Sequence, residues 1–414
     1  MTDAGDPTAS RRAVLATGVL GAATALAGCS ATGGGPLETF DGAVDVDPTL
    51  ARDGPSWPVV HGDPANTRAV SASVAPEPPL SLEWSYDYET HVGHVHPVGR
   101  DGAVVGSNLV DDVFAVDAGS GRHDWRITDD QILEAEFEPR TNPVVTDDAV
   151  LIGTRSRLWS FDQEDGNVRW NADESIDLGV LRSGPTADDR SAFVGTTVGV
   201  AAHDLESGER EWERSIGLRL GGVPAVRDDA VYLGGNDATL HALERESGDV
   251  RWRRNADGAI EAGPAVTASG IYVGTAAGTV IAYDFDGTER WRTAVDGAVE
   301  TLAAGNGIIC ATTDDALAVL DPETGDRAWR STRYLDTVAA GVAICGRWLF
   351  ATIEDTSEGV HVGHAGRVGA FDAETGRLEW ESDESGFVAG PAVIDGALYL
   401  TGRLGDPSAV VKLA

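Results

Sequence analysis

Lysine and cysteine are scarce in this sequence. Lys412 is the only lysine of the 414 residues, although lysine and arginine together number 31. The three cysteines are Cys29, Cys310 and Cys345, and no two of them are adjacent. A disulfide requires two close and correctly aimed Cβ atoms, so we expect Cys310 and Cys345 to be free, buried thiols, with a bridge between them as the less favoured alternative.

Motifs of several enzyme classes are also missing. The chain has no His-Glu-x-x-His, no Gly-x-Ser-x-Gly and no phosphate-binding glycine loop, so it gives no support for a metalloprotease, a serine hydrolase or a nucleotide-binding protein. A long apolar run is missing too. The weakly apolar residues 13–27 are too few to span a bilayer stably.

Negative charge is what the chain has in excess. The formal net charge is −36, and the carboxylates are spread along the whole chain instead of forming one patch for a cationic partner. Dense carboxylates with almost no lysine resemble the surface of a protein from an extreme halophile, where molar salt shortens the Debye length to about 3 Å. This charge disfavours nucleic acids and anionic lipid headgroups as partners.

Tryptophan recurs along the chain with a period of about forty residues. The eight periodic positions are Trp84, Trp125, Trp170, Trp212, Trp252, Trp291, Trp329 and Trp380. Seven of them close the phrase Asp-x-x-x-Gly-x-x-x-Trp or a near variant, as in Asp372, Gly376 and Trp380. In one copy Glu244 replaces the aspartate, and in another the turn after Asp284 is one residue shorter. A fixed period of this size indicates one supersecondary unit copied many times.

Each unit is predicted to contain four short strands. In the copy that ends at Trp291 these are residues 264–266, 271–274 and 280–283, with the fourth beginning at the tryptophan. Short runs rich in β-branched residues between Gly, Asp and Asn turns favour antiparallel hairpins. In the repeated turn, the acid can accept hydrogen bonds from backbone amides and the glycine tolerates positive φ, so this phrase is turn chemistry and not catalysis.

One such sheet cannot bury both faces alone, and radial stacking is the common solution at this period. We therefore predict an all-β fold, an eight-bladed β-propeller of four-stranded antiparallel blades, with each tryptophan buried as a wedge between blades. The last unit has three strands and lacks a fourth. Residues 82–86, which carry Trp84, are predicted to supply it by pairing with the C-terminal strand and so to close the ring. Seven blades is the fallback if Trp84 lies outside the sheet.

The repeat resembles that of pyrroloquinoline quinone (PQQ)-type propellers. The resemblance is carried by Ala-x-Asp-x-x-Thr-Gly-x-x-x-Trp, seen here from Ala370 to Trp380, and covers about residues 57–414; Trp57-Pro58-Val59-Val60-His61-Gly62-Asp63-Pro64 resembles the segment that often precedes such propellers. The family contains quinoprotein dehydrogenases and also cofactor-free scaffolds such as the outer-membrane assembly lipoprotein, so the fold leaves function open. The dehydrogenases would show an adjacent cysteine pair, calcium ligands and a catalytic aspartate. No adjacent cysteines exist here, and the acidic residues cannot be matched position by position.

The N-terminus resembles an export and lipidation signal of haloarchaeal type. Ser10-Arg11-Arg12 begins a twin-arginine pattern, in which Val14 and Ala16 depart from the usual residues, and Leu26-Ala27-Gly28-Cys29 resembles a lipobox. We expect a signal peptide over residues 1–28, lipidation at Cys29, a flexible tether over 29–56 that is rich in Gly, Pro, Ala and Asp, and the propeller over 57–414. An uncleaved apolar helix beside an unmodified cysteine is the alternative. The expected location is the outer face of the cytoplasmic membrane, held by the lipid alone.

Histidines offer the one candidate metal site. His91, His94 and His96 lie in the loop that enters the first blade, and His361 and His364 lie in an insertion of the seventh, 353–367. We expect both loops on one face of the ring, where imidazole and carboxylate groups could hold a transition metal. This spacing matches no dedicated metal motif. Polar loops whose histidines contact water or the rim are the favoured interpretation.

The sequence therefore favours a non-enzymatic, monomeric surface lipoprotein whose propeller binds a protein or a small ligand as a scaffold module, with no cofactor expected. The alternative is a PQQ- or metal-dependent oxidoreductase that uses the mouth of the channel. A surface-layer component that self-associates in high salt is a third class.

Overall fold

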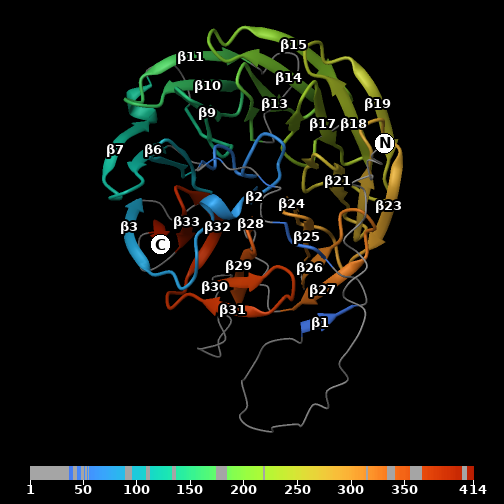
Figure 1. Ribbon diagram of the computed structural model, residues 1–414. Helices are drawn as coiled ribbons and strands as arrows, with labels where there is room; N and C mark the ends of the chain where they lie inside the picture. The colour runs from blue at the N-terminus through green and yellow to red at the C-terminus, as the bar shows by residue number, and fades with distance from the viewer. Residues whose placement is uncertain are drawn as a thin grey trace, which may run out of the picture. The chain divides into compact units, whose positions relative to one another are not determined.

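The structure, a computed structural model, places eight β-sheet blades around a ring (Figure 1). It describes residues 37–40, 44–47, 51, 54, 56–88, 96–108, 112–132, 137–173, 184–217, 220–313, 316–332, 341–354, 366–402 and 408–414. Short runs of β-branched residues form the strands, and they are separated by turns at Gly, Asp and Asn. In these residues no helix is long and apolar enough to cross a membrane.

Blades 1 to 4 each consist of four consecutive antiparallel strands. Their strands are β4 (Val98–Arg100), β5 (Ala103–Ser107), β6 (Asp112–Asp117) and β7 (His123–Thr128); β8 (Val144–Val145), β9 (Ala149–Gly153), β10 (Arg157–Asp162) and β11 (Val168–Asp173); β12 (Thr186–Ala187), β13 (Ser191–Gly195), β14 (Gly199–Asp204) and β15 (Arg210–Ser215); and β16 (Ala225–Arg227), β17 (Ala230–Gly234), β18 (Thr239–Glu244) and β19 (Val250–Asn255).

Blades 5 to 8 complete the ring. Their strands are β20 (Ala265–Thr267), β21 (Gly270–Gly274), β22 (Thr279–Tyr283) and β23 (Glu289–Ala294); β24 (Thr301–Gly305), β25 (Ile308–Thr312), β26 (Leu317–Leu320) and β27 (Arg327–Ser331); β28 (Val342–Cys345), β29 (Trp348–Glu354), β30 (Gly366–Asp372) and β31 (Leu378–Glu381); and β32 (Phe387–Ile394), β33 (Ala397–Gly402), β34 (Ser408–Leu413) and β3 (Leu82–Tyr88). Two short 3₁₀ helices, Ala72–Val74 and Asp129–Gln131, lie in connections.

The predicted closure of the ring is confirmed. Strand β3 pairs antiparallel with the C-terminal strand β34, from Leu82 opposite Leu413 to Tyr88 opposite Ser408, so Trp84 lies inside the sheet and the ring has eight blades. The predicted strands are close to those observed, although β23 begins at Glu289, two residues before Trp291. Cys310 and Cys345 are free and buried, as predicted, and Cys345 is the last residue of β28.

The tryptophans do lie at the joints between blades, but only three of the eight are fully buried. Trp125, Trp212 and Trp329 have at most 8% of their surface exposed, and the other five are half-buried. In seven joints the indole N–H donates to a backbone carbonyl of the next blade, at the residue after its repeated acid. These acceptors are Ala118, Gln163, Leu205, Arg245, Phe285, Pro322 and Ala373. The indole is therefore a hydrogen-bonding link as well as a wedge.

The repeated glycine contributes to the same joint. Its φ lies between +67° and +80° in all seven copies, and in each copy a Cβ would meet the tryptophan of the preceding blade, as Gly121 would meet Trp84. The repeated acid acts within the turn, as predicted: Asp117 accepts from the amide of Ser120, and this bonding holds the pKa of Asp117 below its usual value. The phrase thus encodes a turn and the surface on which the neighbouring blade packs.

A strand that precedes the ring is added to the outer edge of blade 6. Strand β1 (Leu37–Thr39) pairs antiparallel with β27, as Figure 1 shows. Farther along, Asp47 donates its amide to the carbonyl of Asn306 in a turn of the same blade, and Val44 is buried. We call the described residues 37–40, 44–47 and 51 the strap. They fall in the segment 29–56 predicted to be a flexible tether, most of which lies outside the described residues, and they are bonded to blade 6.

Candidate functional site

The axis of the ring is crossed by residues 57–70, which we call the plug. Its backbone is hydrogen-bonded to the first, innermost strand or the following turn in blades 1, 2, 4, 5, 6 and 7. The pairs are Trp57 with Gly99, Pro58 with Val145, Pro64 with Val226, Ala65 with Val266, Thr67 with Ala304, Arg68 with Ile344 and Val70 with Gly346. Short strand β2 (Ala69–Val70) also pairs with β28 and lies near the centre of the ring (Figure 1). The plug therefore connects six blades through backbone hydrogen bonds at the axis.

Hydrogen bonds of the Asp63 and Asn66 side chains hold the plug in its shape. The carboxylate of Asp63 accepts from the backbone and the hydroxyl of Thr67, and the side-chain amide of Asn66 donates to the carbonyls of Val223 and Pro264 in two different blades. A short Asp or Asn side chain that bonds nearby backbone in this way is typical of a tight turn. The plug is thus a structured element of the ring.

His61 and Arg68 of the plug lie near His96, so three basic side chains are grouped at this point. Burial lowers the pKa of His61 well below its usual value, the charges of Arg68 and His96 lower it further, and a hydrogen bond with Asn66 partly opposes this. His61 is therefore neutral at pH 7 beside the cationic Arg68. The predicted metal site pointed to this region through His96, but sequence reasoning missed His61, although it had singled out the segment from Trp57 to Pro64.

Most of the predicted histidine site lies outside the described residues. This holds for His91, His94, His361 and His364, and also for the lipidation residue Cys29. Within the described part of the chain, no group of three or more His, Cys, Asp or Glu side chains is placed to hold a metal ion. Arg68 would complement an anionic quinone, but the adjacent cysteines are missing and the plug already bonds the inner strands. The described residues therefore do not fit a quinone and its calcium ion, and we derive no step through them.

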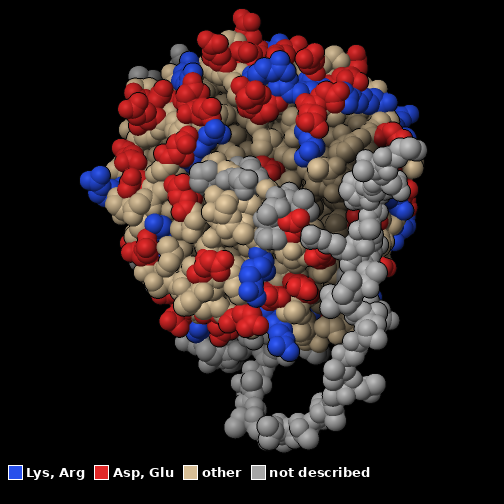
Figure 2. Space-filling model, in the orientation of Figure 1, with Lys and Arg blue, Asp and Glu red and all other residues tan. Residues whose placement is uncertain are grey.

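A groove runs beside the plug over the turns of blades 2 to 4. Its cavity of ≈ 1070 Å³ is bounded by Pro58 and Pro64 of the plug and by charged residues, including Asp189 and Glu206 in turns and Glu211 in β15. Smaller cavities of ≈ 670 and ≈ 540 Å³ adjoin it and share lining residues with it. Figure 2 shows the wider setting, a face on which Asp and Glu predominate and Arg side chains lie among them.

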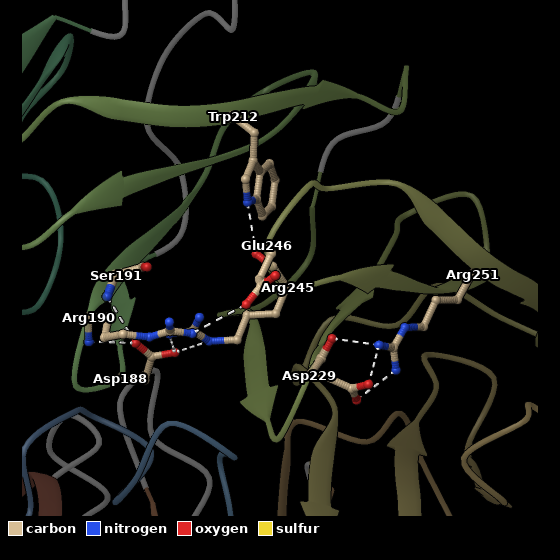
Figure 3. Close-up of polar contacts among 8 residues, drawn as sticks. All are labelled: Asp188, Arg190, Ser191, Trp212, Asp229, Arg245, Glu246 and Arg251. Carbon is tan, nitrogen blue, oxygen red and sulfur yellow. Dashed lines mark hydrogen bonds and ion pairs between the residues drawn. The ribbon is translucent and has the colours of Figure 1, made fainter.

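Ion pairs bind the turns that form the floor of this groove. Arg245 of blade 4 reaches Asp188 of blade 3 at 2.5 Å, and only 7% and 17% of the two side chains are exposed. The hydrogen bond to Asp188 raises the pKa of Arg245 above its usual value. Arg251 pairs with Asp229 at 2.6 Å within blade 4, outside the lining of the groove, and Asp229 is largely exposed (Figure 3). By contrast, Arg190 and Glu246 are 3.8 Å apart and largely exposed.

The groove can therefore bind ligands through charged side chains, but its buried pair serves the joint between blades. The thiols of Cys310 and Cys345 offer no chemistry, because burial raises the pKa of each and keeps it protonated.

Comparison with solved structures gives the same architecture. BamB from Moraxella catarrhalis matches with a TM-score of 0.65 and 18% identity, over 81% of this chain and 100% of that one. Quinohemoprotein alcohol dehydrogenase from Comamonas testosteroni matches with a TM-score of 0.67 and 16% identity, over 88% of this chain and 81% of that one. A europium-containing methanol dehydrogenase matches with a TM-score of 0.66 and 13% identity, over 88% and 99%. Identities this low establish the fold alone.

Comparison with curated proteins gave no match. A family model does match residues 81–219 and 236–349, which are more than half of the chain, and its description is outer membrane protein assembly factor BamB. Its repeats are the PQQ-like repeats that the tryptophan phrase indicated. The chain therefore belongs to the family described as outer membrane protein assembly factor BamB.

Proposed function

We propose that this protein is a non-enzymatic, monomeric surface lipoprotein whose ring serves as a binding or scaffold module. The main observation in support of this proposal is the position of the plug. It bonds the innermost strands or turns of six blades, so the chain itself occupies the backbone positions that face the axis there. A rigid ring of this kind presents its turns and its rim to other molecules.

The groove beside the plug is the surface that we assign to a ligand. It spans the turns of blades 2 to 4, and its buried ion pair, Arg245 with Asp188, holds turns of blades 3 and 4 in place. Among the described residues Asp189 and Glu211 line it without an ion pair of their own, and both add to the field around Arg245. A partner with exposed cationic groups would gain most from this rim, and in molar salt only close contacts would contribute.

Capture in high salt tests the groove. The double variant Asp189→Arg/Glu211→Arg reverses two charges on its lining, and Glu323→Arg reverses one exposed charge in a turn of blade 6 as the matched control. We expect the wild type and the control to retain the same partner and the groove variant to lose it. Retention of every partner by the groove variant would refute the assignment of this groove.

Attachment at Cys29 and display on the outer face of the membrane complete the proposal. The twin-arginine pattern and the lipobox support it. Cys29→Ser is expected to release the protein from the membrane fraction into the medium, and Arg11→Lys/Arg12→Lys to retain it inside the cell. Membrane association that survives Cys29→Ser would argue against a lipid anchor.

A PQQ- or metal-dependent oxidoreductase is the second candidate. The described residues do not fit a quinone and its calcium ion, and what supports this candidate is the neutral His61 beside His96. Dye reduction by the purified protein with an alcohol or a sugar, PQQ and calcium tests this candidate. Turnover that His61→Ala or His96→Ala abolishes would replace the scaffold proposal.

A further inference from the structure

The outer edge of blade 6 differs in sequence from the other seven. In every outer strand one residue directly precedes the periodic tryptophan, and in seven blades it is charged: Asp124, Arg169, Glu211, Arg251, Arg290, Glu379 and Glu83. In blade 6 this residue is Ala328, which is 6% exposed. Charged side chains on an edge strand discourage the addition of another strand. The outer strand of blade 6 keeps Arg327 and Arg330 but lacks the charge at this one position, and it is the strand on which β1 is docked.

Side chains of β27 hold the docked strand. The amide of Phe40 donates to the carbonyl of Ala328 at 3.0 Å, and the guanidinium of Arg327 lies 4.4 Å from the centre of the Phe40 ring. The carboxylate oxygen Oε2 of Glu38 lies 3.6 Å from the guanidinium nitrogen Nη1 of Arg330, whose side chain is 16% exposed. The edge thus recognises an extended segment by its backbone, by one carboxylate and by one aromatic ring.

The strand leaves part of this site unfilled. All three residues of β1 are exposed, Leu37 at 39%, and only three residue pairs join β1 to β27. A cavity of ≈ 470 Å³ remains beside it, lined by Leu37, Phe40, Val44, Ala328, Trp329 and Arg377 among others. Few buried contacts and exposed backbone mark a segment that opens at low cost.

We propose that the outer edge of blade 6 is a binding site for an extended segment of a partner protein, and that β1 is the resident occupant which this segment displaces. The partner segment carries a carboxylate for Arg330 and a large apolar or aromatic side chain for the cavity. Strand addition of this type draws affinity from main-chain hydrogen bonds and specificity from side-chain pockets. The inference rests on the proposed scaffold role and names one kind of partner for it.

Peptide binding to the full chain tests the proposal. The probe is a fluorescein-labelled peptide with the sequence of residues 36–41, measured by anisotropy in high salt. In the wild type, the covalently linked strap competes at an effective concentration in the millimolar range. Phe40→Pro in the protein removes the amide that bonds Ala328 and the ring over Arg327, and so opens the site. We expect the peptide to bind this variant at least about tenfold more tightly than the wild type.

Two further proteins identify the edge as the binding site. Ala328→Arg, added to Phe40→Pro, restores the charge of the other blades and is expected to abolish binding. Arg330→Glu, added to the same variant, repels the peptide carboxylate and keeps the test valid if Ala328→Arg does not fold. Glu379→Ala removes the edge charge of blade 7 as the control and is expected to gain no binding.

Equal affinity in the wild type and Phe40→Pro, or binding that survives Ala328→Arg and Arg330→Glu in folded protein, would overturn the proposal. Neither result would affect the groove assignment, because Asp189 and Glu211 lie on other blades and are tested by capture.

Discussion

Seven joints between blades share one design, and the joint between blades 7 and 8 departs from it. In the seven, an indole donates to the next blade and rests on a turn glycine. Trp380 makes no such bond among the described residues, because blade 8 has no turn between its third and fourth strands: β34 and β3 come from opposite ends of the chain. Blades 7 and 8 are instead joined by a backbone pair between Gly366 and Phe387.

The comparison shows that the repeated phrase is a property of the joint and not of the single blade. The joint between blades 8 and 1 supports this. Trp84 comes from the strand that closes the ring, yet it donates to Ala118 and packs on Gly121 as the other tryptophans do. A joint is regular when the next blade has a turn between its third and fourth strands to accept the indole. Blade 8 lacks this turn, because its third and fourth strands come from the two ends of the chain, so the joint between blades 7 and 8 is irregular.

The turn glycine should give the largest effect on stability. Gly248→Ala forces an alanine to φ +67° and places its Cβ against the indole of Trp212, whereas Gly102→Ala meets only the backbone demand at φ +81° in open space. We expect Gly102→Ala to lower the free energy of unfolding by about 1–2 kcal/mol. Gly248→Ala should lose roughly 1–3 kcal/mol more because of overpacking. Denaturant titration in high salt measures both, and equal losses would show that the glycine serves the turn alone.

The ion pair between blades 3 and 4 is the next most sensitive feature of a regular joint. Asp188→Asn leaves the guanidinium of Arg245 charged and only 7% exposed, so we expect a loss of roughly 2–3 kcal/mol. Glu246→Gln breaks the exposed 3.8 Å contact with Arg190 and should cost less than about 0.5 kcal/mol. The same titration compares them. A similar small loss in both variants would mean that the buried pair is incidental to the joint.

The indole hydrogen bond separates the two kinds of joint directly. Trp212→Phe keeps an aromatic ring but leaves the carbonyl of Arg245 without its donor, which lies at 2.8 Å in the wild type. We expect this variant to lose about 1–3 kcal/mol more than Trp380→Phe, which has no such bond to lose. Thermal unfolding followed by tryptophan fluorescence provides the comparison. An equal loss of stability in the two variants would mean that the indole contributes through packing alone.

The regular joints are also the part of the molecule that the sequence predicts best. The period of the tryptophans led to the eight blades and to β3 as the closing strand, because period and strand pattern are local properties of the chain. The plug and the strap were not predicted. Their residues follow no repeat, and their bonds join positions such as Asn66 and Pro264 that are far apart in sequence. Glycine and proline before residue 57 suggested a tether, and the pairing of its described residues 37–39 with blade 6 carries no signal in that composition.

The histidine metal site stays a prediction, and the neighbours of His61 could not be predicted from the sequence for a similar reason. His96 was chosen from a cluster of histidines, whereas His61 stands alone in the sequence and gains its neighbours Arg68 and His96 only in the fold. The alanine at position 328 carried a readable signal, because the seven equivalent residues are charged. That signal becomes clear only when the outer strands are aligned by their tryptophans.

The smallest expected effect distinguishes one regular joint from another under acid. His241 of β18 is 5% exposed, and Ile281 of β22 fills the same strand position in the next blade. Burial lowers the pKa of His241, Arg253 lowers it further and Asp237 opposes them. Above the unfolded-state pKa of about 6.5, the residue is neutral in both states and adds no pH dependence. Below it, the unfolded chain takes up a proton that the folded chain resists, so stability falls as pH falls.

His241→Ile should therefore reduce the loss of melting temperature between pH 7 and pH 5 relative to the wild type. The difference is bounded by about 1.4 kcal/mol per pH unit for a single proton. Scans in molar salt at both pH values measure it. If His241→Ile loses as much stability on acidification as the wild type, the acid sensitivity arises elsewhere. His241 would then contribute to its joint as Ile281 contributes in the next blade, without an effect of pH.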